Sequence, residues 1–102
     1  MATRTLRHAS IKPAHPGELL REVVIPATGL PKAEIARLLG ISRQQLYDIV
    51  AERKPVTPAT AMRLGKLFGD GPGAWWRMQA ELDLWEAALS LDVSAIPTLK
   101  VA

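Results

Sequence analysis

Cysteine is absent from this chain of 102 residues, and histidine occurs only at His8 and His15. Without thiols the protein forms neither disulfides nor thiolate metal sites, and nothing in its composition favours an oxidising compartment. The only other histidine lies in the N-terminal segment, so for His15 a role in capping or turn packing is favoured over metal binding. We therefore expect no metal and no cofactor.

Long apolar runs are also absent, and so is any group of residues that carries out catalysis. The first thirty residues begin with the polar, basic segment MATRTLRHAS, which is neither a secretory signal nor a membrane span. The chain has no nucleophile–base pair, no glycine-rich phosphate loop and no cluster of metal ligands. We expect a single-domain protein of the bacterial cytoplasm that is not an enzyme and does not contact membranes.

The net charge of +3 is unevenly distributed along the chain. Residues 1–66 contain 11 Lys or Arg and 5 Asp or Glu, whereas residues 67–102 contain 2 and 5. The basic part predicts a polyanion as partner. The acidic part should face away from DNA, toward a second copy or a basic protein. An ordinary solvated surface is the alternative explanation of this bias.

Two short helices separated by a glycine are predicted between residues 32 and 50. The apolar residues with helical spacing are Ile35, Ala36, Leu38 and Leu39, followed by Ile41, Leu46, Ile49 and Val50. Gly40 suits the left-handed conformation that ends a helix, and Ser42 suits the N-cap of the next one. Ala36 leaves room for two helices to cross steeply. We predict helices over 32–39 and 42–51, which together form a helix-turn-helix.

This stretch closely resembles the DNA-binding motif of the lambda/434-repressor class. Its alanine, glycine, cap and apolar positions all match, although an αα-hairpin that only packs is the alternative. In this class the first turn of the second helix meets base edges in the major groove. The predicted base contacts are Arg43, Gln44, Gln45 and Tyr47. The predicted phosphate contacts are Lys32, Ser42, Arg53 and Lys54.

The chemistry of these side chains supports the assignment. Arg43 can bond both O6 and N7 of guanine, and a glutamine can do the same with N6 and N7 of adenine. Each residue also has a simpler role open to it. Arg43 would make only a surface pair, Gln45 would be only solvated, and Tyr47 would only flank the core.

Three further helices are expected around this motif. The first begins at His15-Pro16 and is closed by Pro26 and Gly29, and the others span about 58–68 and 72–89. Residues 1–14 are predicted to be a basic, flexible arm, residues 15–91 the DNA-binding domain, and residues 92–102 a tail. The arm is either disordered or lies along DNA, and the tail is either frayed or an extended segment paired with a partner.

The last expected helix carries an apolar seam with spacings of 3 and 4. We assign part of this seam to a dimer surface, made by Trp75, Met78, Leu82 and Trp85. Trp75 or Trp76 is also expected to belong to the core. We assign part of the seam to a dimer surface because a small helical domain does not easily cover the apolar area of so many large side chains.

Four segments together extend the resemblance over residues 15–84. They are HPGELLRE, GLPKAEIARLLGISRQQLYDIV, VTPATAMRLGKLFG and PGAWWRMQAELDL. They are similar to the HigA/VapI-type antitoxin family of the lambda-repressor-like (XRE) superfamily. The resemblance implies an all-α, five-helix domain with a long C-terminal helix. It also implies a homodimer that binds a palindromic operator in double-stranded DNA, represses its own operon and neutralises a RelE/HigB-like ribonuclease toxin.

Two positions depart from that family pattern. The turn after the recognition helix is usually Asn-Gly-Lys, but here it is Ala51-Glu52-Arg53. Loss of the glycine predicts a slightly longer recognition helix, and Glu52 adds a negative charge near the expected phosphates. Lys32 stands where a glutamine is frequent, and it offers a phosphate a point charge without the geometry of an amide.

Other functions remain open to such a chain. A stand-alone helix-turn-helix regulator without a toxin shares the same motif. A protein-interaction module that has lost DNA binding is a further alternative, supported only by the change at Ala51-Glu52.

Overall fold

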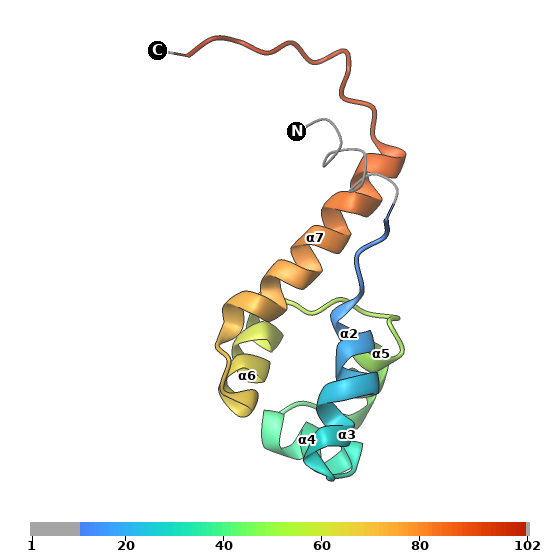
Figure 1. The fold of residues 1–102 in the computed structure, drawn as a ribbon, viewed down its shortest axis with the longest axis vertical. Helices are drawn as coiled ribbons and strands as arrows, with labels where there is room; N and C mark the ends of the chain where they lie inside the picture. Colours follow the sequence, from blue (N-terminus) through green and yellow to red (C-terminus); the bar gives the residue numbers. More distant parts are fainter. Residues whose placement is uncertain (1–10, 102) are drawn as a thin grey trace.

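The computed structural model describes residues 11–101, which form five helical segments joined by short turns (Figure 1). The first segment is continuous through α2 (Pro16–Leu19), η1 (Leu20–Val24) and α3 (Ile25–Thr28). The others are α4 (Lys32–Leu39), α5 (Arg43–Val50), α6 (Pro58–Phe68) and α7 (Pro72–Ser90). These residues contain no strand, and the predicted all-α, five-helix fold with a long C-terminal helix is confirmed.

Local signals in the sequence place most helix ends where the structure has them. Gly40 ends α4 in the left-handed conformation, with φ of 74°. The Ser42 side chain accepts a hydrogen bond from the Gln45 backbone N–H, and Thr57 caps α6 in the same way at Thr60. Consequently α4 and α6 have the predicted bounds, and α7 ends one residue beyond its predicted end.

Of the two residues predicted to close the first helical segment, Gly29 does so and Pro26 does not. The segment continues to Thr28 and ends at Gly29, whose φ is 70°. The stretch η1 is π-helical, and the Ile25 N–H donates to the Leu20 carbonyl five residues earlier. A proline inside an α-helix lacks an N–H and clashes with the preceding turn, and the wider π-helical turn just before Pro26 relieves that conflict.

The recognition helix α5 also differs from its prediction, because it is not lengthened by the loss of glycine. It ends at Val50, and Glu52 adopts the left-handed conformation with φ of 63°. The Glu52 N–H donates to the Ile49 carbonyl and the Arg53 N–H to the Asp48 carbonyl, at 3.0 and 2.8 Å. These two bonds form a Schellman motif, so Glu52 takes the backbone conformation that glycine usually provides.

The core lies between the first helix, the helix-turn-helix, α6 and α7. Its largest fully buried side chains are Leu20, Ile35, Leu46, Val56, Leu64 and Trp75. Gly17 allows α2 to approach α5 closely, since a Cβ there would lie 1.9 Å from the Ile49 carbonyl oxygen. The first helix is thereby packed directly against the end of the recognition helix.

The apolar seam of α7 faces this core, which corrects part of the dimer assignment. Trp75 and Leu82 are only 1% and 4% exposed, while Met78 and Trp85 are half-buried. The chain itself covers Trp75 and Leu82, so these two side chains have almost no surface left for a second copy. Met78 and Trp85 keep part of their surface exposed, and their place in a dimer surface stays a prediction.

The two ends of the described chain extend away from the helical body. Residues 91–101 leave α7 as an extended segment, and residues 11–15 lead into α2 (Figure 1). The predicted basic arm lies mostly outside the described residues. No helix within residues 11–101 is long and apolar enough to span a membrane.

Candidate nucleic-acid interface

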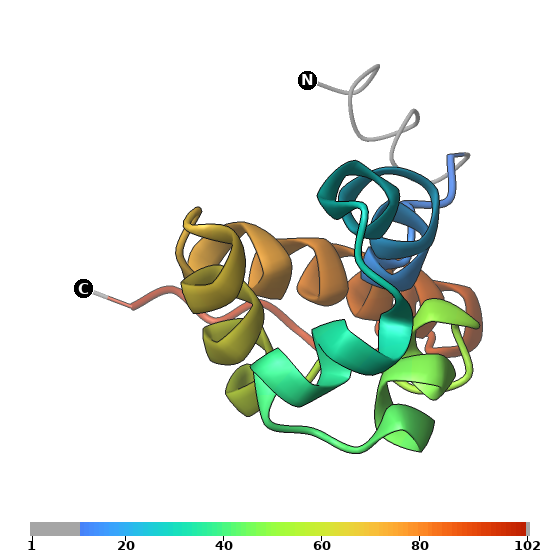
Figure 2. The same ribbon diagram turned by 90° about the horizontal axis from the view of Figure 1, so that it is seen from below.

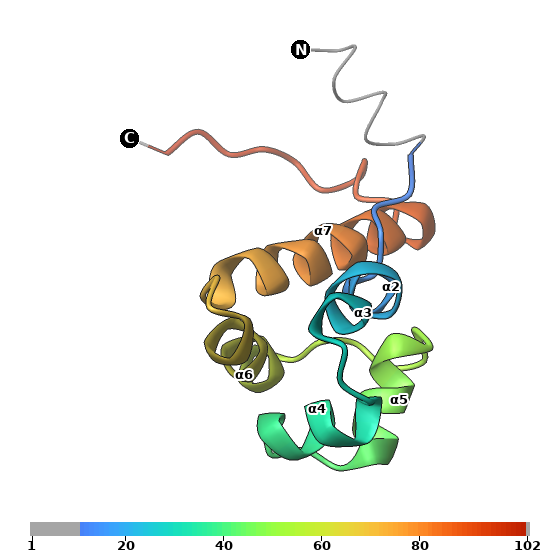
Figure 3. The same cartoon turned by 60° about the horizontal axis from the view of Figure 1, so that its bottom comes forward.

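Helices α4 and α5 lie at the end of the molecule opposite α7 (Figures 2 and 3). On α5 the side chains of Leu46, Ile49 and Val50 are buried against the core. All four predicted base-contacting residues are exposed on the same helix, namely Arg43, Gln44, Gln45 and Tyr47. The helical period therefore separates a core face from a polar face, and the structure places the predicted base contacts together.

The groups at the start of α5 are suited to bind an anion or the edge of a base. Ser42 Oγ accepts the Gln45 N–H at 3.0 Å, which fixes the first turn. The hydroxyl remains able to donate its own proton to a phosphate oxygen. The positive end of the helix dipole is also directed outward here, next to the Arg43 side chain.

Asp48, which the sequence analysis did not single out, organises part of this surface. Its Oδ1 accepts hydrogen bonds from Gln44 Nε2 and Arg53 Nε, both at 3.0 Å. The pKa of Asp48 is lowered, chiefly by the hydrogen bond from Arg53 and further by the one from Gln44. The i,i+4 spacing of Gln44 and Asp48 was visible in the sequence, but the position of Arg53 depends on the turn at Glu52.

Not all of the predicted phosphate contacts are equivalent in the structure. Lys32 at the start of α4 and Lys54 in the loop after α5 are both exposed. Arg53 is also exposed, but its guanidinium is paired with Asp48 at 2.9 Å. Lys32 and Lys54 are therefore the predicted phosphate contacts that are directly available. Arg53 could contact a phosphate only by leaving Asp48 or by binding Asp48 and the phosphate together.

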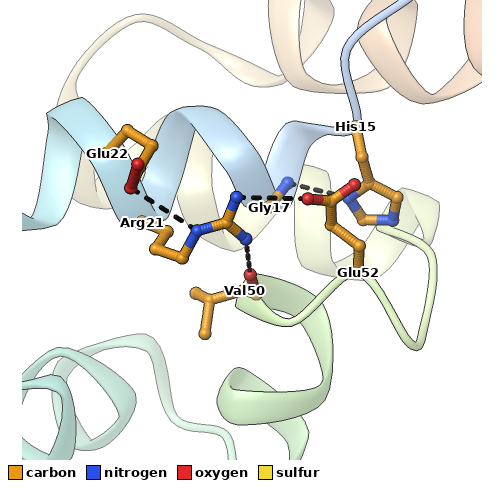
Figure 4. Close-up of polar contacts among 6 residues, drawn as sticks. All are labelled: His15, Gly17, Arg21, Glu22, Val50 and Glu52. Carbon is orange, nitrogen blue, oxygen red and sulfur yellow. Dashed lines mark hydrogen bonds and ion pairs between the residues drawn. The ribbon is translucent and has the colours of Figure 1, made fainter.

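Arg21 is a further residue that the sequence analysis missed (Figure 4). Its guanidinium donates to the Val50 carbonyl oxygen at the last residue of α5. It also donates to Glu52 Oε2 at 3.2 Å. The Glu52 carboxylate is thereby held by a cation of the same chain, which reduces the repulsion expected between Glu52 and DNA. Arg21 belongs to the HPGELLRE segment, and this family motif is the sequence feature from which its role could have been suspected.

Gln79 fixes the loop that follows the recognition helix. The side chain is only 3% exposed, and its Oε1 accepts the Val56 backbone N–H at 2.9 Å. Its Nε2 donates to Asp83 Oδ1, also at 2.9 Å. The tryptophan-x-x-glutamine segment thus has a structural role, since it ties α7 to the loop that carries Lys54.

The arrangement as a whole suits double-stranded DNA better than a small molecule or a metal. A capped helix presents arginine and amides in one exposed row, with an exposed lysine at the start of α4 and another in the loop after α5. Within residues 11–101 no group of three or more His, Asp or Glu side chains could hold a metal ion. An α-helix with these dimensions and side chains fits the major groove of B-DNA.

Comparison with known proteins agrees with this geometry. A family model described as helix-turn-helix (HTH_3) matches residues 20–76. Virulence-associated protein I of Dichelobacter nodosus is 39% identical over 70 residues. That match covers 69% of this chain and 65% of the relative, so the chain spans slightly less than two thirds of that protein's length.

Two solved structures with bound DNA are similar over most of the chain. Antitoxin GraA in complex with its operator is 30% identical, with a TM-score of 0.79 over 89% of this chain and 95% of that chain. Pseudomonas aeruginosa antitoxin HigA with the higBA promoter is 29% identical, with a TM-score of 0.75 over 86% of this chain and all of that chain.

Proposed function

This chain belongs to the helix-turn-helix (HTH_3) family of DNA-binding regulators and antitoxins, and from that premise we propose that it is a type II antitoxin. In this proposal a dimer binds a palindromic operator, represses its own operon and neutralises a RelE/HigB-like ribonuclease toxin. The proposal rests chiefly on one observation. The exposed face of a capped α5 carries Arg43, Gln44, Gln45 and Tyr47 together.

Base reading is assigned to the first two turns of α5. Arg43 reads a guanine through O6 and N7, and Gln45 reads an adenine through N6 and N7. Gln44 has its amide nitrogen directed to Asp48, so it offers its carbonyl oxygen to a base amino group. Tyr47 lies one turn later and contacts a thymine methyl group or a phosphate.

Phosphate contacts fix the register of α5 without reading sequence. Lys32 at the start of α4 and Lys54 in the loop after α5 are exposed and supply point charges. Ser42 adds a hydroxyl donor, and Arg53 joins them when it shares Asp48 with the DNA backbone. These contacts make the affinity strongly dependent on salt, since each neutralised phosphate releases counterions.

A dimer is required because one recognition helix reads too few base pairs for a useful specificity ratio. Two α5 helices should lie about 34 Å apart, or a multiple of that distance, on a two-fold symmetric operator. The operator complexes of GraA and HigA support the assignment of an operator to this chain.

Toxin neutralisation is supported by relatedness and by charge. The two solved relatives are named as antitoxins, and residues 67–102 of this chain are net acidic. A ribonuclease carries a basic surface for its RNA, so an acidic surface on the antitoxin complements it.

Fluorescence anisotropy on the chain's own upstream DNA and on a scrambled duplex, at two salt concentrations, tests the repressor function. We expect a preference for the upstream DNA of roughly a thousandfold or more, together with a steep dependence on salt. Equal weak binding to both duplexes would reject the repressor.

Co-expression with the product of the neighbouring gene tests the toxin function separately. If that product arrests growth, this chain should restore growth and co-purify with it. A neighbour with no effect on growth, combined with specific operator binding, would favour the alternative of a stand-alone helix-turn-helix regulator.

A further inference from the structure

The outer face of α7 carries a second apolar stripe, distinct from the seam that is buried in the core. The residues of this outer stripe are Trp76, Ala80, Leu84 and Ala87, at spacings of 4, 4 and 3. Trp76 is 43% exposed and Leu84 is 72% exposed. Small alanines between large side chains allow a second helix to approach closely along such a stripe.

An apolar groove lies beside the first turn of α7. It has a volume of about 370 Å³, and its walls come from α6 and α7. The lining residues are Pro58, Ala61, Met62, Pro72, Gly73 and Trp76. Met62 is 66% exposed although it lies next to Trp76, so the two side chains leave apolar surface open to water.

The C-terminal segment 91–101 is the third apolar surface. It is extended, and its large side chains Leu91, Val93, Ile96, Leu99 and Val101 are 55–90% exposed. Apolar side chains exposed together in this way are typical of a surface that a partner covers. Such a segment is expected to be covered by a partner.

None of residues 91–101 lines the groove of its own chain. The groove lies at the first turn of α7, whereas the segment leaves from the last turn (Figure 1). The 19 residues of α7 separate these points by about 28 Å. In an antiparallel pair of α7 helices, the last turn of one copy lies beside the first turn of the other. The segment then emerges next to the partner's groove.

Charges along α7 agree with the same antiparallel pairing. Residues 78–99 contain four acidic residues and no Lys or Arg, whereas Lys66 on α6 and Arg77 near the start of α7 are exposed. Antiparallel pairing places Asp92 of one copy near these cations of the other. A parallel pair would instead place the acidic ends together.

We propose that two copies pair antiparallel along the outer stripe of α7, and that residues 91–101 of each copy occupy the Met62–Trp76 groove of the other. This inference rests on the dimer in the proposed function and assigns its surface. A two-fold axis perpendicular to α7 and directed toward the α4–α5 end keeps both recognition helices on one side of the dimer (Figure 3).

Disulfide trapping tests the exchange directly, because the natural chain contains no cysteine. The Met62→Cys chain is mixed with the Leu99→Cys chain under mild oxidation and analysed on a non-reducing gel. We expect a covalent dimer from the mixture and little from either chain alone. The matched control pairs Leu99→Cys with Lys32→Cys, an exposed position on α4 that should give no dimer.

The double variant Met62→Cys/Leu99→Cys carries both cysteines in one chain. It distinguishes a C-terminal segment bound in the partner's groove from one bound in the groove of its own chain. A disulfide-linked dimer supports the proposal, while an internally linked monomer overturns it. Absence of any crosslink in mixture and double variant also overturns it.

Sedimentation of point variants gives a second readout that does not depend on cysteines. Leu84→Glu and Leu99→Glu change exposed residues and should keep the helical circular dichroism, yet raise the dimer dissociation constant by at least tenfold. Val23→Glu, at a 56% exposed position on the first helix, is the matched control and should not change it. Unchanged dimerisation in both α7 and tail variants would overturn the proposal. Operator anisotropy on the same proteins shows separately whether the repressor function fails.

Discussion

At the scale of single residues, some side chains on the polar face of α5 are hydrogen-bonded within the chain, and others are left available for the proposed contacts with DNA. Asp48 holds Gln44 and Arg53 through one carboxylate oxygen. Arg43 makes no ion pair with any residue that the structure describes. Asp48 therefore orients its neighbours, and Arg43 is the side chain best placed to read a base.

Replacing Arg43 with alanine should relax specificity. We expect Arg43→Ala to lose about 1–3 kcal/mol of binding free energy on the operator and much less on random DNA, since a bidentate guanine contact is lost. Anisotropy titrations on both duplexes measure the difference. Lys54→Ala is the matched control and should weaken binding to both duplexes alike. Equal losses on both duplexes for Arg43→Ala would reject its role in base reading.

Acid should weaken the contacts around Asp48. The Arg53 hydrogen bond lowers the pKa of Asp48 in the folded state below its usual value of about 3.9. The carboxylate therefore contributes its full stability above about pH 4, and this contribution is lost as the pH falls through the lowered pKa. Urea unfolding at a series of pH values should show a shallower acid-side decline for Asp48→Asn. An unchanged decline would show that the pair does not contribute.

At the scale of secondary-structure elements, the turn after α5 is the part of the interface that departs most from its family pattern. Glu52 adopts a left-handed conformation that costs a non-glycine residue about 1–2 kcal/mol. The same residue accepts a hydrogen bond from Arg21, which also holds the end of α5. The chain thus combines a strained backbone position with a contact between the first helix and the recognition helix.

Two substitutions at Glu52 separate these effects. Glu52→Gly and Glu52→Ala both lose the ion pair with Arg21, but only glycine relieves the strain at positive φ. We expect the glycine variant to be about 1 kcal/mol more stable than the alanine variant in urea unfolding. Equal stabilities would mean that the turn adopts another conformation when the glutamate is absent.

At the scale of the whole molecule, the surface proposed for DNA and the helix proposed for pairing lie on opposite sides of the helical body (Figure 3). The principal extents are 50 × 30 × 23 Å, with α4 and α5 at one end and the end of α7 at the other (Figure 1). This separation keeps acidic α7 away from phosphates. It also allows contacts along α7 to form while α5 remains available to DNA.

In the proposed dimer the distance between the two recognition helices is fixed, so binding should depend on the spacing of the operator half-sites. Inserting about 5 base pairs between the half-sites rotates one of them to the opposite side of the duplex, so the dimer can engage only one. We expect the affinity in anisotropy titrations to fall toward that of a single half-site. Inserting a full turn of about 10 base pairs keeps both half-sites on the same side of the duplex and is therefore the control for their orientation. Affinity that is indifferent to the insertion would show that the two recognition helices bind independently.

Local chemistry in the sequence was sufficient to determine the helix-turn-helix. Gly40, Ser42 and Thr57 act through backbone conformation and caps within a few residues, so α4, α5 and α6 could be located without tertiary information. The alternation of buried and exposed residues on α5 follows from the helical period. The exposed row that begins at Arg43 was predictable for the same reason.

Only the tertiary structure decided which face of α7 is buried. Both of its apolar stripes have helical spacing, and spacing cannot distinguish a core from a dimer surface. Packing against α6 and the first helix buries Trp75 and Leu82 and leaves Trp76 and Leu84 outside. The contacts of Arg21 and Gln79 were likewise hidden, because each joins residues more than twenty positions apart in the chain. The left-handed Glu52 was hidden because residues other than glycine seldom adopt that conformation. Sequence periodicity determines the faces of a helix, whereas only the neighbouring elements decide which of those faces is covered.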